Sequence, residues 1–240
     1  MTGETTAEAS AAAVSGMGSG FLLDPATYMA GAAKGFTGLD FYFVGRAGVL
    51  GEVDADLASA ALVFFSPDVV RTNWEQGKGV MDRVDASQAL AECCATWADG
   101  HLADDVDWAR LAELAGKVVA AAPAVGAPLF AGWRQLPVPE DPKQRALHQL
   151  NVLRELRMAR HGAAVVAMGL DIADAVRHRT PGMLGIYGWP EASLPDGFAA
   201  RWDEAERLTN VGSARDYAVL DDAEAADFVR LGEAALAAVS

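Results

Sequence analysis

The sequence predicts an all-α fold built as a multi-helix bundle. From Phe21 onward, apolar residues recur at the three- and four-residue spacing of helices rather than in the alternation of strands. Alanine, leucine, glutamate and arginine dominate where a β protein would carry valine, isoleucine, threonine and tyrosine. Residues that cap helices also precede several of the apolar stretches. Together these three observations indicate a mostly helical chain.

The first 20 residues are expected to form a disordered tail. This stretch is rich in alanine, serine, threonine and glycine and contains no aromatic residue. It therefore offers too little apolar area to offset the entropy that ordering would cost.

Residues 21–122 are predicted to form an N-terminal helical domain. Asp54 and Asp107 each precede an apolar stretch whose free amides they can cap. Pro67 suits the first turn of a helix, and Pro123 ends the last helix of the domain. The expected helices cover residues 54–65, 67–74, 87–97 and 107–122.

Residues 123–141 are predicted to be a Pro/Gly-rich connection to a C-terminal helical domain at residues 142–240. Prolines in this stretch fix backbone dihedrals and remove amide donors, so no helix can continue through it. Asp141 and Pro142 then supply an N-cap and a first-turn proline. The helices expected in this domain cover residues 142–169, 172–176, 198–208 and 222–238, with a turn or short hairpin between 210 and 220.

The composition is that of an acidic globular chain. Its 240 residues carry 33 acidic and 19 basic side chains, giving a formal net charge of −14, and 52% of them are hydrophobic. A basic face is typical of DNA-binding proteins, so this charge argues against DNA as a partner.

Targeting signals and a disulfide framework are both missing from the sequence. No stretch is long and apolar enough for a transmembrane helix, and the N-terminus lacks the positive charge of a secretory signal. We therefore expect a cytoplasmic protein with no membrane partner. Cys93 and Cys94 are adjacent, which would strain a mutual disulfide, so both are expected to be reduced, buried thiols.

One arginine stands inside an aromatic and glycine-rich run, Phe-Tyr-Phe-Val-Gly-Arg-Ala-Gly, at residues 41–48. A long cation in such surroundings needs water, an acid or an anionic ligand. Two interpretations of Arg46 stay open. It is either a structural arginine bonded to backbone carbonyls or to an aspartate, or an anchor for a ligand.

The densest basic stretch lies on the long helix predicted after Pro142. Arg154, Arg157 and His161 follow one another at spacings of three and four, so they share one helical face, with Arg160 beside it. An apolar segment of small residues follows His161 and is expected to be buried. The imidazole is therefore expected at the border between the charged helix face and the apolar interior. There it could act as a general acid or base, or bond a bound carboxylate or phenol. The alternative is a satisfied core histidine beside ordinary arginine salt bridges.

Motifs for cofactors and metals are missing from the sequence. It contains no phosphate-binding loop, no Gly-x-Ser-x-Gly elbow and no dinucleotide fingerprint. His148 and Glu155 share a helical face, but they lie two turns apart and lack a third ligand. We therefore expect no cofactor and no bound metal.

Residues 42–51, residues 154–176 and a C-terminal helix containing Trp202 form a recognisable pattern. In these blocks the sequence resembles an actinobacterial family of uncharacterised all-helical proteins labelled as helix-turn-helix. The resemblance implies an all-α core with a winged-helix-like C-terminal portion and no agreed activity. The positions that it marks are Tyr42, Gly45, Arg46, Arg157 and His161.

The chain departs from this family in two places. Between Arg157 and His161 the family usually has an acidic, glycine-containing step, whereas this chain has Met-Ala-Arg. The part after Leu208 is short and acidic and lacks a basic recognition helix. Contact with phosphates would be repulsive along much of that surface.

The leading hypothesis is a small-molecule-binding helical protein, or a cofactor-independent enzyme of secondary metabolism, that acts on an anionic or aromatic ligand. In it, arginines hold the anionic group and a histidine exchanges a proton with the ligand. The expected ligand-binding residues are Tyr42, Arg46, Arg154 and Arg157, and the expected catalytic residue is His161.

Two alternatives belong to other classes of function. A transcriptional regulator of the helix-turn-helix type would read DNA through residues 154–160 or 201–215. A structural or partner-binding protein would use adjacent acidic and apolar helix faces, which also favour a homodimer.

Overall fold

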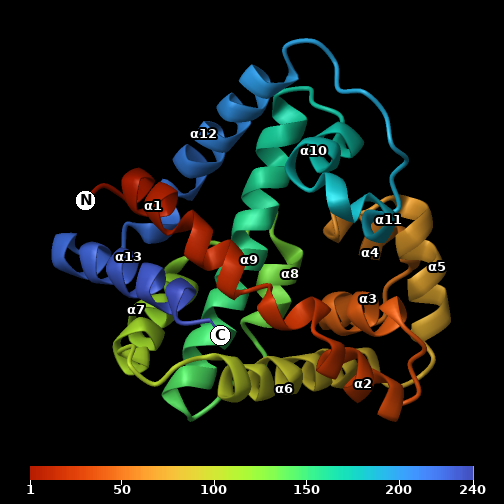
Figure 1. Ribbon diagram of the computed structural model, residues 1–240, viewed down its shortest axis with the longest axis horizontal. Helices are drawn as coiled ribbons and strands as arrows, with labels where there is room; N and C mark the ends of the chain where they lie inside the picture. The colour runs from red at the N-terminus through yellow and green to blue at the C-terminus, as the bar shows by residue number, and fades with distance from the viewer. Residues whose placement is uncertain (240) are drawn as a thin grey trace.

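The computed structural model describes residues 1–239, and thirteen α-helices and three 3-10 segments make up its regular structure (Figure 1). These residues form no strand, only an isolated bridge between Leu102 and Val239, so the predicted all-α fold is confirmed. The α-helices are α1 (Gly3–Met17), α2 (Pro25–Ala33), α3 (Leu39–Ala47), α4 (Ala55–Ala61), α5 (Pro67–Gly77), α6 (Arg83–His101), α7 (Trp108–Ala121), α8 (Pro128–Trp133), α9 (Pro142–Ala167), α10 (Ile172–Arg179), α11 (Leu184–Tyr187), α12 (Phe198–Tyr217) and α13 (Asp222–Ala237). The 3-10 segments are η1 (Gly20–Leu23), η2 (Gly48–Leu50) and η3 (Pro181–Met183).

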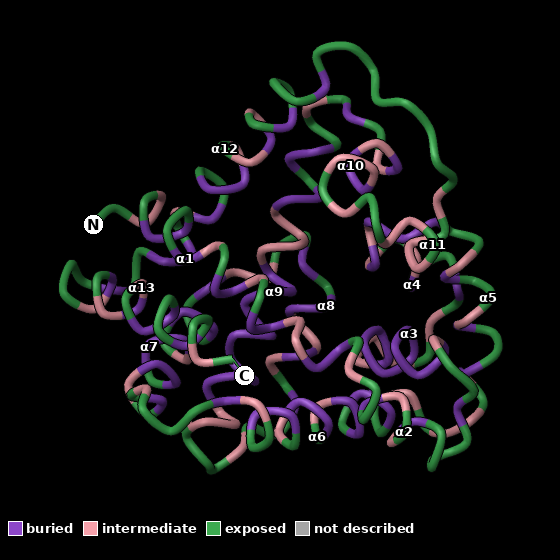
Figure 2. The backbone as a smooth tube through the Cα atoms, viewed as in Figure 1, coloured by how far each residue is buried: buried purple, intermediate pink, exposed green. Residues whose placement is uncertain are grey.

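Helix α9 runs through the middle of the molecule and packs against α1, α6, α7, α8 and α12 (Figure 1). Its start follows the sequence prediction, because the Asp141 side chain accepts hydrogen bonds from the amides of Lys143 and Gln144, with Pro142 in the first turn. Figure 2 shows α9 buried along much of its length. A buried central helix can present polar side chains to an enclosed space, which is why α9 organises the candidate site.

The predicted N-terminal tail is wrong, because residues 3–17 form α1, which packs against α12, α13 and α9. Val14 and Met17 are fully buried in the main core. The small residues that argued against order instead let helices approach closely. At Gly3, an added Cβ would overlap the carbonyl of Ala214.

The predicted break after Leu208 is also wrong, because α12 continues to Tyr217 and residues 210–217 form neither a turn nor a hairpin. The polar residues in this stretch suggested exposure, yet they are buried and several bond to α9. The buried polar residues of this stretch are Thr209, Asn210, Ser213 and Asp216. The winged-helix-like portion is not confirmed, since residues 142–239 contain helices and no sheet.

The expectation that residues 123–141 hold no helix is wrong, because α8 lies within them with Pro128 in its first turn. The main hydrophobic core draws on both sides of this stretch. It joins residues from α1, α3, α6, α7 and α9 to the C-terminal helices, and Trp74, Phe130 and Trp133 are among its fully buried side chains. A second, smaller core lies where α10 and α12 meet α9, around Val165 and Trp202. The second core borders the candidate site, because its Phe64, Val176 and Trp202 line the cavity described below.

The predicted helix caps and buried cysteines are present in the structure. Asp54 and Asp107 cap α4 and α7 as predicted. Cys93 and Cys94 are buried free thiols, and burial raises the pKa of each. Within residues 1–239, no helix has the length and apolar character needed to cross a membrane.

Candidate functional site

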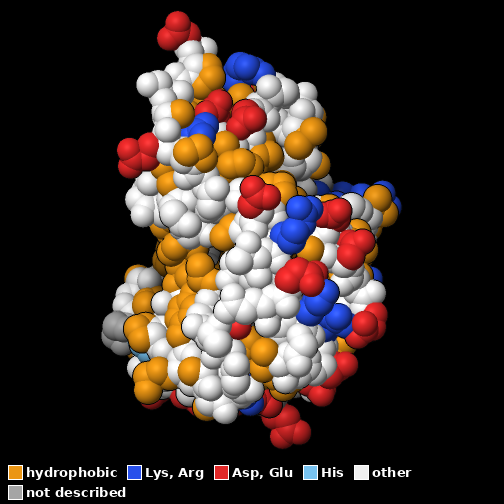
Figure 3. All heavy atoms as spheres, turned by 90° about the vertical axis from the view of Figure 1, so that its right-hand side faces the viewer, with side chains coloured by type: hydrophobic (Ala, Val, Ile, Leu, Met, Phe, Trp, Pro, Cys, Tyr) orange, Lys and Arg blue, Asp and Glu red, His pale blue; other side chains and the backbone are white. Residues whose placement is uncertain are grey.

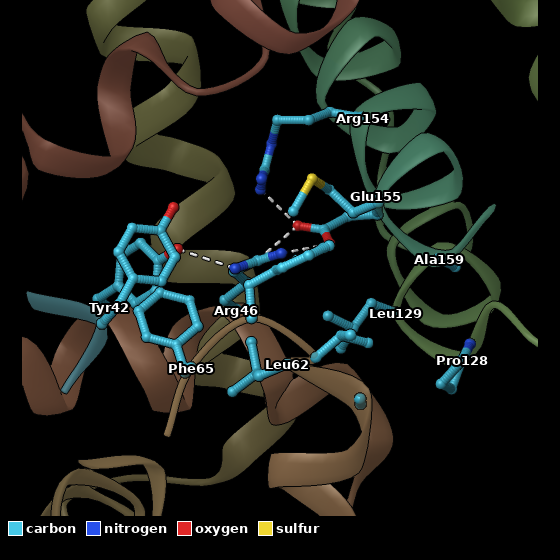
Figure 4. Close-up of a pocket in the computed structure, with 14 residues that line it drawn as sticks. Tyr42, Arg46, Leu62, Phe65, Pro128, Leu129, Arg154, Glu155 and Ala159 are labelled. Atoms are coloured by element: carbon cyan, nitrogen blue, oxygen red, sulfur yellow. Dashed lines mark hydrogen bonds and ion pairs between the residues drawn. The ribbon is translucent and has the colours of Figure 1, made fainter. Parts of the chain in front are cut away.

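Arg46, in the last turn of α3, is buried and paired with an acid from α9. Its Nε donates to Oε1 of Glu155 at 2.7 Å, and its Nη2 donates to Oε2 at 2.9 Å (Figure 4). Its Nη1 donates to the Tyr42 hydroxyl at 2.8 Å. Each of the three guanidinium nitrogens therefore bonds within the protein. This is the structural role that the sequence left open for Arg46, but its partner is a glutamate rather than an aspartate or backbone carbonyls.

A second arginine shares the same carboxylate. Arg154 Nη2 donates to Oε1 of Glu155 at 2.5 Å, and its Nε donates to Asn151 at 3.3 Å. The Arg46, Arg154 and Glu155 side chains are only 4%, 7% and 1% exposed. Two buried cations thus face one anion, and this group, which we call the arginine triad, has one excess positive charge.

The triad shifts the pKa values of its members in line with that charge. Burial opposes ionisation of Glu155, but Arg154 and Arg46 outweigh it and hold the pKa of the carboxyl below its ordinary value. Burial lowers the pKa of Arg154 and Arg46 lowers it further, against the attraction of Glu155. The other titratable groups that act on the two arginines are tyrosines, which are neutral at physiological pH.

Arg154 also lines a cavity of about 580 Å³ that is bordered by α1, α9, α10 and α12 and open to solvent on one side. Figure 3 shows a hollow between the upper and lower parts of the molecule, with hydrophobic side chains gathered in it. Phe64, Tyr187 and Trp202 give the cavity an aromatic wall, and α1 gives it a wall of alanine, serine and glycine. A separate space of only about 40 Å³ lies beside Arg46 and Tyr42. The structure therefore brings Arg154, Arg157 and His161 to the large cavity, whereas Tyr42 and Arg46 line the small space, which Arg154 also borders.

His161 lies on the cavity wall between two aromatic rings. Its ring stacks on Phe64 with centroids 5.5 Å apart and lies nearly perpendicular to Trp202 with centroids 4.9 Å apart. Nδ1 lies 2.9 Å from the Thr209 hydroxyl, and Nε2 lies 3.8 Å from Oε1 of Glu206. Burial lowers the pKa of His161, Glu206 opposes the shift, and Arg157 and Arg179 add to it. The imidazole is therefore biased toward its neutral form, which can accept a proton.

The three other arginines in or beside this site, Arg157, Arg160 and Arg179, differ in their partners. Arg157 bonds to Glu206 at 3.1 Å and to Asn210 at 3.0 Å. Arg160, which lies beside the helical face shared by Arg154 and His161, is outside the cavity and bonds to Asp216. Arg179, at the end of α10, lines the cavity and has no ion pair or hydrogen bond among residues 1–239. It adds a second unpaired positive charge to the cavity.

Sequence reasoning missed several residues of this site. Glu155 was weighed only as a weak metal ligand, although an acid inside a basic, buried stretch was a signal of ion pairing. Glu206, Thr209, Arg179 and Tyr187 left no local signal, because they reach the site only through the packing of α10, α11 and α12. Across residues 1–239, no three His, Cys, Asp or Glu side chains are grouped as a metal site.

A family model described as a helix-turn-helix family matches residues 7–193, which is more than half of the chain. No curated protein and no solved structure shows significant similarity to the chain.

Proposed function

The chain belongs to this helix-turn-helix family, and from that premise we propose that it binds a small anionic ligand with an aromatic or otherwise apolar body. A shared fold fixes no activity, so the argument rests on the site. The observation that carries it is the excess positive charge of the arginine triad beside the 580 Å³ cavity.

A buried charge without a partner is costly, and a ligand anion removes that cost. Arg154 is the member of the triad that reaches the large cavity, and Arg179, which has no partner among residues 1–239, lies at the same cavity. A carboxylate or sulfonate at Arg154 would accept charge-assisted hydrogen bonds, and Arg179 adds positive charge to the same cavity. The volume lies within the usual range for small-molecule sites, about 300–1,000 Å³. Phe64, Tyr187 and Trp202 would contact the apolar body of the ligand.

The family match also raises the DNA-binding alternative, which the arginine contacts disfavour. Arg154, Arg157 and Arg160 are all engaged inside the protein. In the second candidate stretch, Arg201 bonds to backbone carbonyls and Arg207 pairs with Glu204. Few of these cations are therefore left to contact the phosphates of DNA. Duplex binding that weakens steeply with salt would favour the regulator instead.

The proposal predicts that the protein prefers an anionic apolar probe to a neutral one of the same shape. Anilinonaphthalene sulfonate and phenylnaphthylamine form such a pair, and their fluorescence rises in apolar pockets. We expect Arg154→Met to weaken the sulfonate about 10- to 100-fold, because it removes a charge-assisted hydrogen bond, and to leave the neutral probe almost unchanged. The fold should persist, since Arg46 and Glu155 remain paired.

Arg207→Met is the matched control, because Arg207 is also paired but lies outside the cavity. It should change neither titration. Equal loss of both probes in Arg154→Met would count against anion recognition. Native and denaturing mass spectra of the freshly purified protein would show whether a ligand is retained, and they also report the subunit number, which tests the expected homodimer.

A further inference from the structure

The hydroxyl of Thr209 determines which nitrogen of His161 carries the proton. Thr209 Oγ1 lies 2.7 Å from the carbonyl oxygen of Ala205, one turn earlier in α12. A carbonyl has no hydrogen, so the single hydroxyl hydrogen of Thr209 lies in this bond. Thr209 Oγ1 can then only accept from His161 Nδ1, 2.9 Å away. His161 therefore carries a hydrogen on Nδ1.

In the neutral imidazole this leaves Nε2 with a free lone pair. Glu206 Oε1 lies 3.8 Å from Nε2, which is too long for a hydrogen bond. The other oxygen of Glu206 accepts from Arg157. Phe64 and Trp202 hold the ring from two sides, so it cannot turn to exchange its nitrogens without disturbing both contacts.

We propose that Thr209 is a positioning residue that fixes His161 as a proton acceptor at Nε2, and that the ligand is a weak acid, a phenol or an enol, whose hydroxyl donates to that atom. This inference rests on the proposed function and names the class of its ligand. On transfer, the O–H bond breaks and an Nε2–H bond forms. The imidazolium then faces Glu206, and the new oxyanion lies in the same cavity as Arg157 and Arg179.

The hydroxyl at His161 is distinct from the anion at Arg154. The two residues are seven positions apart on α9, which places their backbones about 10 Å apart along the helix axis. The ligand therefore carries two groups at opposite ends of an apolar body, a permanent anion and a weakly acidic hydroxyl. An aromatic acid with a remote phenol has this form.

The tautomer is tested first, on the protein without any ligand. NMR of nitrogen-labelled histidine, with His161→Gln to assign the signals, should show Nδ1 protonated and Nε2 unprotonated at neutral pH. Thr209→Val removes the acceptor at nearly constant volume and should shift the proton to Nε2, whereas Thr209→Ser should keep the wild-type pattern. An Nε2–H tautomer in the wild-type protein would overturn the inference, whether or not any variant folds.

The ligand class is tested with hydroxy-nitrophenylacetate, whose phenolate absorbs visible light. Binding to the wild-type protein should raise the ratio of phenolate to phenol about tenfold at fixed pH, equal to one pKa unit. Thr209→Ser should retain this shift, and His161→Gln should lose it because no group is left to take the proton.

The outcomes separate this inference from the proposed function. Binding of the nitrophenol without an absorbance shift would overturn the role of His161 and leave anion binding intact. Failure of the nitrophenol to bind while the sulfonate probe binds would overturn the assigned ligand class. Failure of both the sulfonate and the nitrophenol would refute the proposed function itself.

Discussion

Replacing Glu155 by glutamine is expected to lower the free energy of unfolding by about 3–5 kcal/mol, the usual cost of leaving a buried charge without its partner. The Glu155 side chain is 1% exposed, and within residues 1–239 it is the only acid that Arg46 and Arg154 contact. Glutamine keeps the shape but removes the charge, so two buried guanidinium groups would face each other without an anion. Urea denaturation followed by circular dichroism at neutral pH would measure the loss. It is a large part of the 5–15 kcal/mol that holds a typical domain together.

Arg46→Met is the informative comparison, because it breaks the same ion pair from the other side. It leaves Arg154 and Glu155 as a neutral pair and so removes the excess charge of the triad. We therefore expect Arg46→Met to destabilise the protein clearly less than Glu155→Gln. Glu204→Gln breaks an exposed pair and should have no measurable effect. Equal losses in the two buried variants would contradict the charge imbalance.

The predictions from sequence succeeded where the determinant is local. Asp54, Asp107 and Asp141 act on amides within three residues of themselves, so the sequence alone identifies the starts of their helices. The face shared by Arg154 and His161 follows from helical periodicity, and both residues line one cavity.

The failures concern contacts between distant parts of the chain. Helix α1 is ordered because its small residues pack against α12 and α13, about 200 positions away in sequence. The polar end of α12 is buried because Asn210 and Asp216 bond to arginines of α9. The partner of Arg46 lies 109 positions away. No periodicity or capping rule predicts such pairings, so the sequence left the role of Arg46 open.

A histidine outside the cavity gives the second large effect, which depends on pH. His148, on α9, is 1% exposed, and both ring nitrogens lack a hydrogen-bond partner within residues 1–239. Burial alone lowers the pKa of His148 from 6.5 to about 4. The unfolded chain therefore binds a proton at a higher pH than the folded protein does. This contribution to stability is complete above about pH 6.5, falls as the pH drops, and levels off below about pH 4 after a loss of about 3 kcal/mol.

His148→Leu isolates this effect because leucine fills similar space and breaks no hydrogen bond of the histidine. The variant should be at least as stable as the wild-type protein at about pH 8, and its advantage should grow by about 2 kcal/mol at about pH 5. His161 also has a lowered pKa, but it is present in both proteins and cancels in the difference between their urea midpoints. A difference that does not change with pH would mean that His148 finds a partner when it is protonated. The expected slope instead requires a histidine that serves as an apolar core residue, unlike His161, whose hydrogen bond to Thr209 and place on the cavity wall suit it to proton transfer.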